Sequence, residues 1–360
     1  MKPITPNSST RGRLNRREFI KGAAGLGLST AGLALLEACG IQPAASTTAA
    51  ERLETTTIRL TNAGTAICRA PQYVAEDFLK AEGFTDVQYV KPGATVNSVD
   101  LLVSGGADMT MGNSGPTILD LDAGKPITML AGIEVGCFVL YGTDQIKEIT
   151  DLKGKSVAIT QLGASDHVFL SAILANVGLD PTKDVTWTLL PVDEQIQVLS
   201  KGKIDAMIAF PPNTYDAQKI GHVLVNSMMD KPWSQYFCCM ATVRRDFAQN
   251  KPVATKRALR ALLRAADSCA LQPERAAKLM VDKGYVTNYD YALQGMKEIP
   301  WNRWREYNPE DTIRFYSLTL HGVGMVKSTP DEIIKRGTDW HFLNELKAEL
   351  PATPFAPAPR

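Results

Sequence analysis

The sequence predicts an α/β fold with two lobes in tandem, followed by a helical C-terminal region, and three observations support this. Short β-rich runs alternate with helix-length amphipathic segments from about residue 56 to residue 250. This alternation is typical of α/β domains with largely parallel sheets. Two stretches of the chain repeat in register, and only helical patterns remain from Pro252 to about Leu350.

The repeat joins two motifs at nearly the same offset. Thr61-Asn62-Ala63-Gly64-Thr65 matches Thr160-Gln161-Leu162-Gly163-Ala164 at an offset of 99 residues, and Ser104–Met111 matches Lys201–Ile208 at an offset of 97. In each copy a strand ends in a Gly-containing turn, and a later helix ends at Gly before a strand that opens with Asp. Chance similarity between ordinary α/β turns is the alternative, but two matches in register favour two similar lobes.

Residues 1–38 have the pattern of an export signal. Arg16-Arg17-Glu18-Phe19-Ile20-Lys21 precedes an apolar run, Gly22–Leu36, of 15 residues that is rich in Gly and Ala. A permanent helical span needs about 20 strongly apolar residues, so we expect a cleaved signal peptide rather than an anchor. Arg16 and Arg17 resemble the paired arginines of the twin-arginine signal, whose route exports folded proteins.

The end of this segment resembles a bacterial lipobox. In Leu36-Glu37-Ala38-Cys39-Gly40, Cys39 would become the lipidated first residue, although Glu37 is an unusual occupant of the motif. Residues 39–55 are rich in small and polar residues and would form a flexible tether. We therefore expect a periplasmic protein that Cys39 tethers to a membrane. The alternative is a basic N-terminus with an incidental cysteine.

The net charge and the length of the chain limit the classes of function that are possible. Residues 1–38 hold six basic and two acidic residues, so the net charge falls from +1 for the chain to −3 without them. A balanced, mildly acidic surface offers no electrostatic footprint for nucleic acid. The remaining 322 residues are more than a single hydrophobic core usually holds and suggest two domains. No later stretch of the sequence is long and apolar enough to span a bilayer.

The expected elements follow in order from about Thr56. One set of strands is Thr57–Thr61, Val87–Val90, Asp108–Met111, Thr128–Leu130 and Cys137–Tyr141, and a second set is Ser156–Thr160, Val185–Leu190, Asp205–Phe210, Val223–Val225 and Phe237–Val243. The helices between them are Tyr73–Lys80, Val96–Val103, Pro116–Asp122, His167–Ala175, Glu194–Ser200 and Asn213–Lys219. Residues 351–360 are rich in Pro and Ala and would form a loose tail.

Four turns follow strands at positions where α/β sheets bind ligands. Such ligands lie at the carboxyl ends of the strands, where helix N-termini present unpaired N–H groups. The turns are Ala63–Arg69, Gly112-Asn113-Ser114, Gly163-Ala164-Ser165-Asp166-His167 and Pro211-Pro212-Asn213. Plain helix capping by Ser165 or Asp166, worth on the order of 1 kcal/mol, would explain any single turn. Four equivalent turns in two facing lobes favour a shared cleft.

These patterns lead to a family resemblance. The N-terminal export signal occurs together with four short motifs, which are Pro71-Gln72-Tyr73-Val74-Ala75, Gly106-Ala107-Asp108, Asp151-Leu152-Lys153-Gly154-Lys155 and Gly202-Lys203-Ile204-Asp205. Over roughly residues 56–300 the chain resembles the periplasmic solute-binding proteins of ABC importers, in the branch for nitrate, sulfonate, taurine and thiamine-pyrimidine precursors.

The resemblance implies two doubly wound lobes of the type II periplasmic binding protein kind, joined by two crossing strands that act as a hinge. We expect the crossings near Cys137–Gly142 and Phe237–Val243. Residues 56–140 and 242–350 would form lobe 1 with the C-terminal helices, and residues 141–241 lobe 2. The chain would act as a monomer, without a cofactor, and capture a small polar or anionic solute such as a sulfonate, taurine, nitrate or a pyrimidine. It would then deliver this solute to ABC permease and ATPase subunits.

The resemblance also places ligand contacts. They would come from Gly64, Thr65, Asn113, Ser114, Gly163, Ser165, His167, Pro212 and Asn213. Arg69 could pair with an anionic group or be a solvated arginine. Glu134 could accept hydrogen bonds from a ligand amine or form an interlobe salt bridge. Phe210, Tyr215 and Trp233 could stack on a planar ring or belong to the core.

Cysteine and histidine positions give no metal site. Adjacent residues of a strand point to opposite faces, so Cys238 and Cys239 are not expected to chelate one metal together. A disulfide from one of them to Cys137 or Cys269, and free buried thiols, both remain open, as does the state of Cys68. The four histidines show no metal-ligand spacing. No Walker loop or GxSxG elbow is present.

Two functions from different classes follow. One is a receptor without enzymatic activity, and the other is an exported enzyme that depends on a cofactor or metal. Folded export often serves proteins that carry a cofactor, and relatives of this fold include a pyrimidine-forming enzyme with a cysteine-rich iron motif. Cys238 and Cys239 are too few for that motif, and no catalytic constellation appears, so the sequence favours the receptor.

Overall fold

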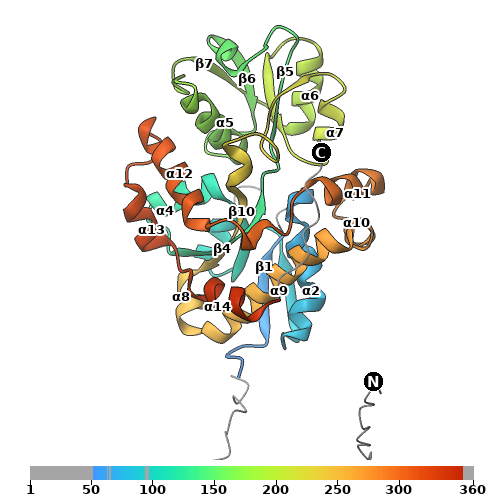
Figure 1. The fold of residues 1–360 in the computed structure, drawn as a ribbon, viewed down its shortest axis with the longest axis vertical. Helices are drawn as coiled ribbons and strands as arrows, with labels where there is room; N and C mark the ends of the chain where they lie inside the picture. The colour runs from blue at the N-terminus through green and yellow to red at the C-terminus, as the bar shows by residue number, and fades with distance from the viewer. Residues whose placement is uncertain (1–51, 63, 65, 94–96, 352–360) are drawn as a thin grey trace, which may run out of the picture. The chain divides into compact units, whose positions relative to one another are not determined.

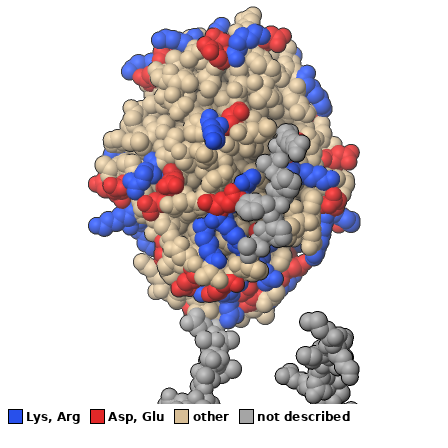
Figure 2. Space-filling model, viewed as in Figure 1, with Lys and Arg blue, Asp and Glu red and all other residues tan. Residues whose placement is uncertain are grey.

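The computed structural model describes residues 52–62, 64, 66–93 and 97–351 (Figure 1). The predicted export signal with Arg16 and Arg17, the lipidation site Cys39, the ligand contact Thr65 and the tail after residue 351 lie outside the described residues. No helix in the described part is both long enough and apolar enough to cross a membrane. Acidic and basic side chains are interspersed on the face in Figure 2 rather than gathered by sign.

The first of two sheets has the strand order β2-β1-β3-β10-β4. Its strands are β1 (Thr57–Thr61), β2 (Asp86–Val90), β3 (Met109–Asn113), β4 (Ile127–Val135) and β10 (Phe237–Arg244). β1 is parallel to β2 and β3, whereas β10 is antiparallel to both of its neighbours. A strand from late in the chain therefore lies inside a sheet that residues 57–135 otherwise build.

The second sheet has the equivalent order β7-β6-β8-β5-β9. Its strands are β5 (Val139–Gly142), β6 (Lys155–Ile159), β7 (Val185–Leu189), β8 (Ala206–Ala209) and β9 (His222–Asn226). β6 is parallel to β7 and β8, and β5 is antiparallel to β8 and β9. We call the first sheet with its helices lobe 1 and the second lobe 2. Both sheets are mixed rather than largely parallel, because each contains a strand next to a crossing that runs against the others.

The repeat in the sequence has a structural basis. Asp108 precedes β3, its carboxylate accepts the backbone N–H of Arg59 at 3.0 Å, and its own N–H donates to the Arg59 carbonyl at 2.8 Å. Asp205 precedes β8 and makes the same pair of bonds with Ser156, at 2.9 and 2.7 Å. Each aspartate thus joins two parallel strands where they begin, and this explains the offset of 97 residues.

Two crossing segments connect the sheets. The first is Gly136–Phe138, between β4 and β5, and the second runs from Ser227 through the 3₁₀ helix η4 (Trp233–Gln235) to β10. They are bonded to each other, since the Phe138 N–H donates to Ser227 Oγ at 2.9 Å and the Ser227 N–H donates to the Phe138 carbonyl at 2.9 Å. Gly136 has φ +64°, and a Cβ there would lie 2.4 Å from the Ser227 carbonyl oxygen.

Helices cover both sheets. Between the strands lie η2 (Ile67–Arg69), α2 (Ala70–Ala81), α3 (Ser98–Val103), α4 (Ser114–Asp122), η3 (Ile149–Leu152), α5 (Ser165–Asn176), α6 (Val192–Ser200) and α7 (Thr214–Ala217). After β10 come α8 (Arg245–Asn250), α9 (Pro252–Leu271), α10 (Pro273–Asp282), α11 (Tyr289–Glu298), η5 (Arg303–Arg305), α12 (Pro309–Gly322), α13 (Pro330–Gly337) and α14 (His341–Glu349). The expectation of helices alone after Pro252 is confirmed. α2 packs on α9, and α4 packs on α12 and α13, at opposite sides of lobe 1 in Figure 1.

Candidate functional site

The turns that follow β1, β3, β6 and β8 meet where the lobes touch. The Ile67 N–H, after β1, donates to the Pro211 carbonyl, after β8, at 3.1 Å. α4 and α5, which follow β3 and β6, pack together, and a Cβ on Gly115 would lie 2.6 Å from Val168. A crevice of only about 10 Å³ remains between the lobes beside Ser114 and Ser165. The four turns therefore share one junction, at which the lobes are closed on each other.

Two ionisable side chains at this junction have atoms without partners among the described residues. Arg69, in η2, donates from Nη2 to the Asn113 side-chain oxygen at 2.7 Å, but its Nη1 is buried and unbonded. Glu134, near the end of β4, has no exposed surface, and neither of its oxygens has a hydrogen-bond partner. Burial, and secondarily the nearby Cys239, raises the pKa of Glu134 well above its ordinary value. No described residue forms a salt bridge with Glu134, so the structure gives no support for the expected interlobe pair.

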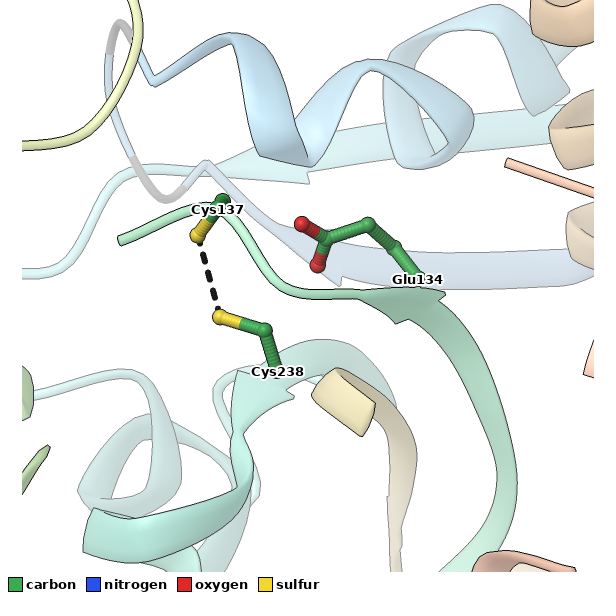
Figure 3. A group of neighbouring side chains, drawn as sticks. All are labelled: Glu134, Cys137 and Cys238. Atoms are coloured by element: carbon green, nitrogen blue, oxygen red, sulfur yellow. Dashed lines mark hydrogen bonds between the residues drawn. The ribbon is translucent and has the colours of Figure 1, made fainter. Parts of the chain in front are cut away.

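Four buried free cysteines surround Glu134. Cys68 comes from η2, Cys137 from the first crossing, and Cys238 and Cys239 from β10. The sulfurs of Cys137 and Cys238 lie 3.0 Å apart, and Figure 3 shows both directed toward the space that the Glu134 carboxyl also faces. The junction thus combines thiols, a carboxyl group and a guanidinium in a buried setting.

The expectation that Cys238 and Cys239 point apart is wrong, because β10 is irregular at this point. Phe237 pairs with Val135 and Cys239 with Glu134, so Cys238 is an extra residue with no partner in β4. Such a bulge bends the strand and changes the direction of its side chains. The Asn113 amide consequently reaches both sulfurs, at 3.5 Å for Cys238 and 3.9 Å for Cys239.

Other predicted ligand contacts form hydrogen bonds within the protein itself. The Ser114 hydroxyl donates to the Phe237 carbonyl at 2.6 Å and so fixes the start of β10. His167 accepts the Gly163 N–H on Nδ1 at 3.0 Å and meets Trp187 edge-to-face, with ring centres 5.0 Å apart. His167 and Gly163 therefore close their own turn in lobe 2. Ser165, the first residue of α5, lines the crevice.

The remaining predicted residues lie around the junction. Gly64 is exposed, and its carbonyl accepts the Tyr73 hydroxyl at 3.0 Å. Phe210 meets Phe138 edge-to-face, while Pro212 and Asn213 are half-buried before α7. Trp233 is 4 % exposed and packs on Phe169 and Phe315, so of the two predicted roles it has the core one.

A second cavity, of about 530 Å³, lies between α7 and β9 of lobe 2 and α11 and η5 of lobe 1. The Tyr215 hydroxyl donates to Glu298 Oε2 at 2.9 Å across it. Burial, together with Glu298, raises the pKa of Tyr141 in its wall to about 12. Sequence reasoning missed Glu298, because α11 reaches α7 only through the packing of the C-terminal helices.

Two mixed sheets, each with an antiparallel strand directly after a crossing, define the fold of periplasmic binding proteins. Comparisons with known proteins agree with this fold. Residues 69–276 match the model of the family described as NMT1/THI5 like. The chain belongs to this family.

Individual relatives are more distant. The taurine-binding periplasmic protein of Escherichia coli (strain K12) is 27% identical over 213 residues, which cover 56% of this chain and 65% of that protein. The chain thus spans less than two thirds of that relative's length. The periplasmic nitrate-binding protein NrtA of Synechocystis PCC 6803 superposes with a TM-score of 0.70 at 17% identity, covering 85% of this chain and 93% of NrtA.

Two further structures show how widely this fold is used. The aliphatic sulphonate binding protein SsuA of Escherichia coli gives a TM-score of 0.63 at 18% identity, over 78% of this chain and 91% of SsuA. The desulfurization enzyme DSZB gives 0.56 at 14% identity, over 81% of this chain and 99% of that one. The fold alone therefore does not separate binding proteins from enzymes.

Proposed function

We propose that the chain is the substrate-binding component of an ABC-type importer, which binds a small polar or anionic solute between its lobes and delivers it to a membrane permease. Membership of the family and the taurine-binding relative support this role. The observation that carries it is the unpaired Arg69 Nη1 and Glu134 carboxyl at the junction of the four turns.

Both groups lack the bonds that burial normally requires. A buried polar group without a partner costs about 1–3 kcal/mol, and more when it is charged. A solute that brings an acceptor to Arg69 and a donor to Glu134 would remove both costs. A zwitterion with an amine and a sulfonate fits both groups, whereas a bare anion such as nitrate fits Arg69 alone. Among the expected solutes, the structure therefore favours taurine-like molecules.

Binding requires the lobes to open. The crevice of about 10 Å³ beside Ser114 is roughly the smallest space that holds one water molecule. We propose that lobe 1 moves against lobe 2 about the two crossings. The expected boundaries near residues 140 and 241 shift to these crossings, because β5 pairs within the second sheet and β10 within the first. The solute would then stabilise the closed arrangement to the extent that it binds this state better than the open one.

A ligand screen tests this role. A solute at 100 times its Kd should add about 2.7 kcal/mol of stability, so taurine, alkanesulfonates, nitrate and pyrimidines are compared by thermal shift and calorimetry. Arg69→Gln should weaken the best solute at least tenfold. Arg314→Gln is the control, because Arg314 of α12 pairs with Asp331 of α13 at the exposed surface. A screen without any shift, or equal loss of affinity in both variants, would contradict the proposal.

We also propose export to the periplasm and a lipid tether at Cys39, on the grounds of the N-terminal motifs. Replacement of Arg16 and Arg17 by Lys should stop export, and Cys39→Ala should move the protein from the membrane fraction to the soluble periplasmic fraction. Unchanged export in the first variant would remove the twin-arginine assignment. Persistent membrane association in the second would remove the lipid tether.

A further inference from the structure

Three side chains at the base of the junction form a compact set of metal ligands. One oxygen of Glu134 and the sulfurs of Cys137 and Cys238 all lie within 4.8 Å of one another. Figure 3 shows them converging from the end of β4, the first crossing and the bulge of β10. All three residues are buried, and both Glu134 oxygens lack a partner among the described residues.

We propose that Glu134, Cys137 and Cys238 bind one thiophilic d¹⁰ cation, for which Zn²⁺ is the test ion. Thiolate and carboxylate are ordinary zinc ligands, at about 2.3 Å for sulfur and 2.0–2.2 Å for oxygen. Two sulfurs at this distance in a tetrahedral site are about 3.8 Å apart. The present separation of 3.0 Å between Cys137 and Cys238 therefore has to widen by less than about 1 Å.

The charges at the site favour a divalent ion. Two thiolates and one carboxylate carry three negative charges, which a divalent ion and the neighbouring guanidinium of Arg69 balance. Without an ion, these three buried side chains must either stay protonated or carry negative charges that nothing compensates. Uncompensated charges are costly in a buried setting. The metal needs only one Glu134 oxygen, so the other remains available to a solute.

The bulge in β10 makes the site possible. In a regular strand Cys238 would face away from the side of the sheet on which Cys239 and Glu134 pair. The extra residue directs the Cys238 sulfur toward Cys137 instead, and the Asn113 amide donates to it at 3.5 Å. A bound ion would tie the first crossing to the strand that follows the second, and so fix the base of the hinge.

A disulfide between Cys137 and Cys238 is the competing chemistry, because the two sulfurs are neighbours. It would consume both thiolates and exclude the ion. Whether the protein holds a metal or a disulfide is therefore measured directly on the full chain, with free thiols counted under denaturing conditions.

The test uses the full chain, purified under reducing, anaerobic conditions and freed of metal by a chelator. Titration with Co²⁺ should reach one equivalent and produce a thiolate-to-cobalt charge-transfer band, which one equivalent of Zn²⁺ removes. Cys137→Ser, Cys238→Ser and Glu134→Gln should weaken binding at least 100-fold or abolish the band. Cys269→Ser is the matched control, because Cys269 is an equally buried thiol in α9 outside this group.

X-ray absorption of the zinc-loaded wild type keeps the test valid if the variants do not fold. Two or more sulfur neighbours with one oxygen neighbour support the site. The proposal is overturned if reduced wild type binds neither Co²⁺ nor Zn²⁺, or if the zinc has no sulfur neighbours. It is equally overturned if the freshly isolated protein carries a Cys137–Cys238 disulfide and no metal, or if the band survives in both cysteine variants.

Discussion

Gly136 lies where the two crossing segments touch, and we expect Gly136→Ala to destabilise the protein strongly. Its φ of +64° is in the left-handed region, which costs an Ala about 1–2 kcal/mol. The new Cβ would also lie 2.4 Å from the Ser227 carbonyl oxygen. Because that contact is backbone, the crossings must separate, at an overpacking cost of about 1–3 kcal/mol. The expected loss of unfolding free energy is about 2–5 kcal/mol.

Gly154→Ala isolates the steric part of this cost. Gly154 has φ +75°, but a Cβ there meets no atom of the described residues within 4 Å, so only the backbone cost of about 1–2 kcal/mol applies. Urea unfolding of both variants and wild type, followed by circular dichroism, gives the comparison. Equal destabilisation of the two variants would refute the reasoning that the crossings are in close backbone contact at Gly136.

Two further predictions concern one ion pair and one histidine. Asp108→Asn should lower the free energy of unfolding, measured in urea, by about 1.5–3 kcal/mol, because the Asp108 carboxylate also binds the Arg59 guanidinium at 2.7 and 3.1 Å. Asp205→Asn should cost less, because among the described residues Asp205 has no arginine partner like Arg59. The reverse order would contradict this account. Burial lowers the pKa of His167 below its ordinary value. As the pH falls, His167 therefore takes up a proton in the unfolded protein before it does so in the folded protein. The free energy of unfolding should thus decrease as the pH drops below about 6.5. His167→Gln should flatten the change in urea midpoint between pH 7.5 and pH 5.5, and an unchanged slope would exclude His167 as its source.

Much of the fold could be predicted from the sequence because it depends on local patterns. The strand and helix alternation, the paired lobes and the helical C-terminal region all leave periodic or repeated signals. Asp108 and Asp205 show why the repeat was visible, since each has the same bonding role at the start of a strand. The expected strand Thr128–Leu130 was too short, because β4 continues to Val135.

The candidate site was less predictable because it depends on long-range geometry. The bulge at Cys238 arises from pairing with β4, about 100 residues earlier in the chain, and no local pattern marks it. Period-two reasoning therefore separated two thiols that the fold brings together. Likewise, Ser114 and His167 have the residue types of ligand contacts, but their hydrogen bonds are spent on β10 and on a turn of lobe 2.

The place of β10 in the first sheet has a consequence for biosynthesis. β3 and β4 leave the ribosome with an empty slot between them, which only residues 237–244 can fill. All strands of lobe 2 are made during that interval, so lobe 2 can fold while lobe 1 still lacks β10, the strand between β3 and β4. In a chain truncated after residue 236 and released from the ribosome, residues 139–226 should therefore resist protease, whereas the earlier segment should be cleaved.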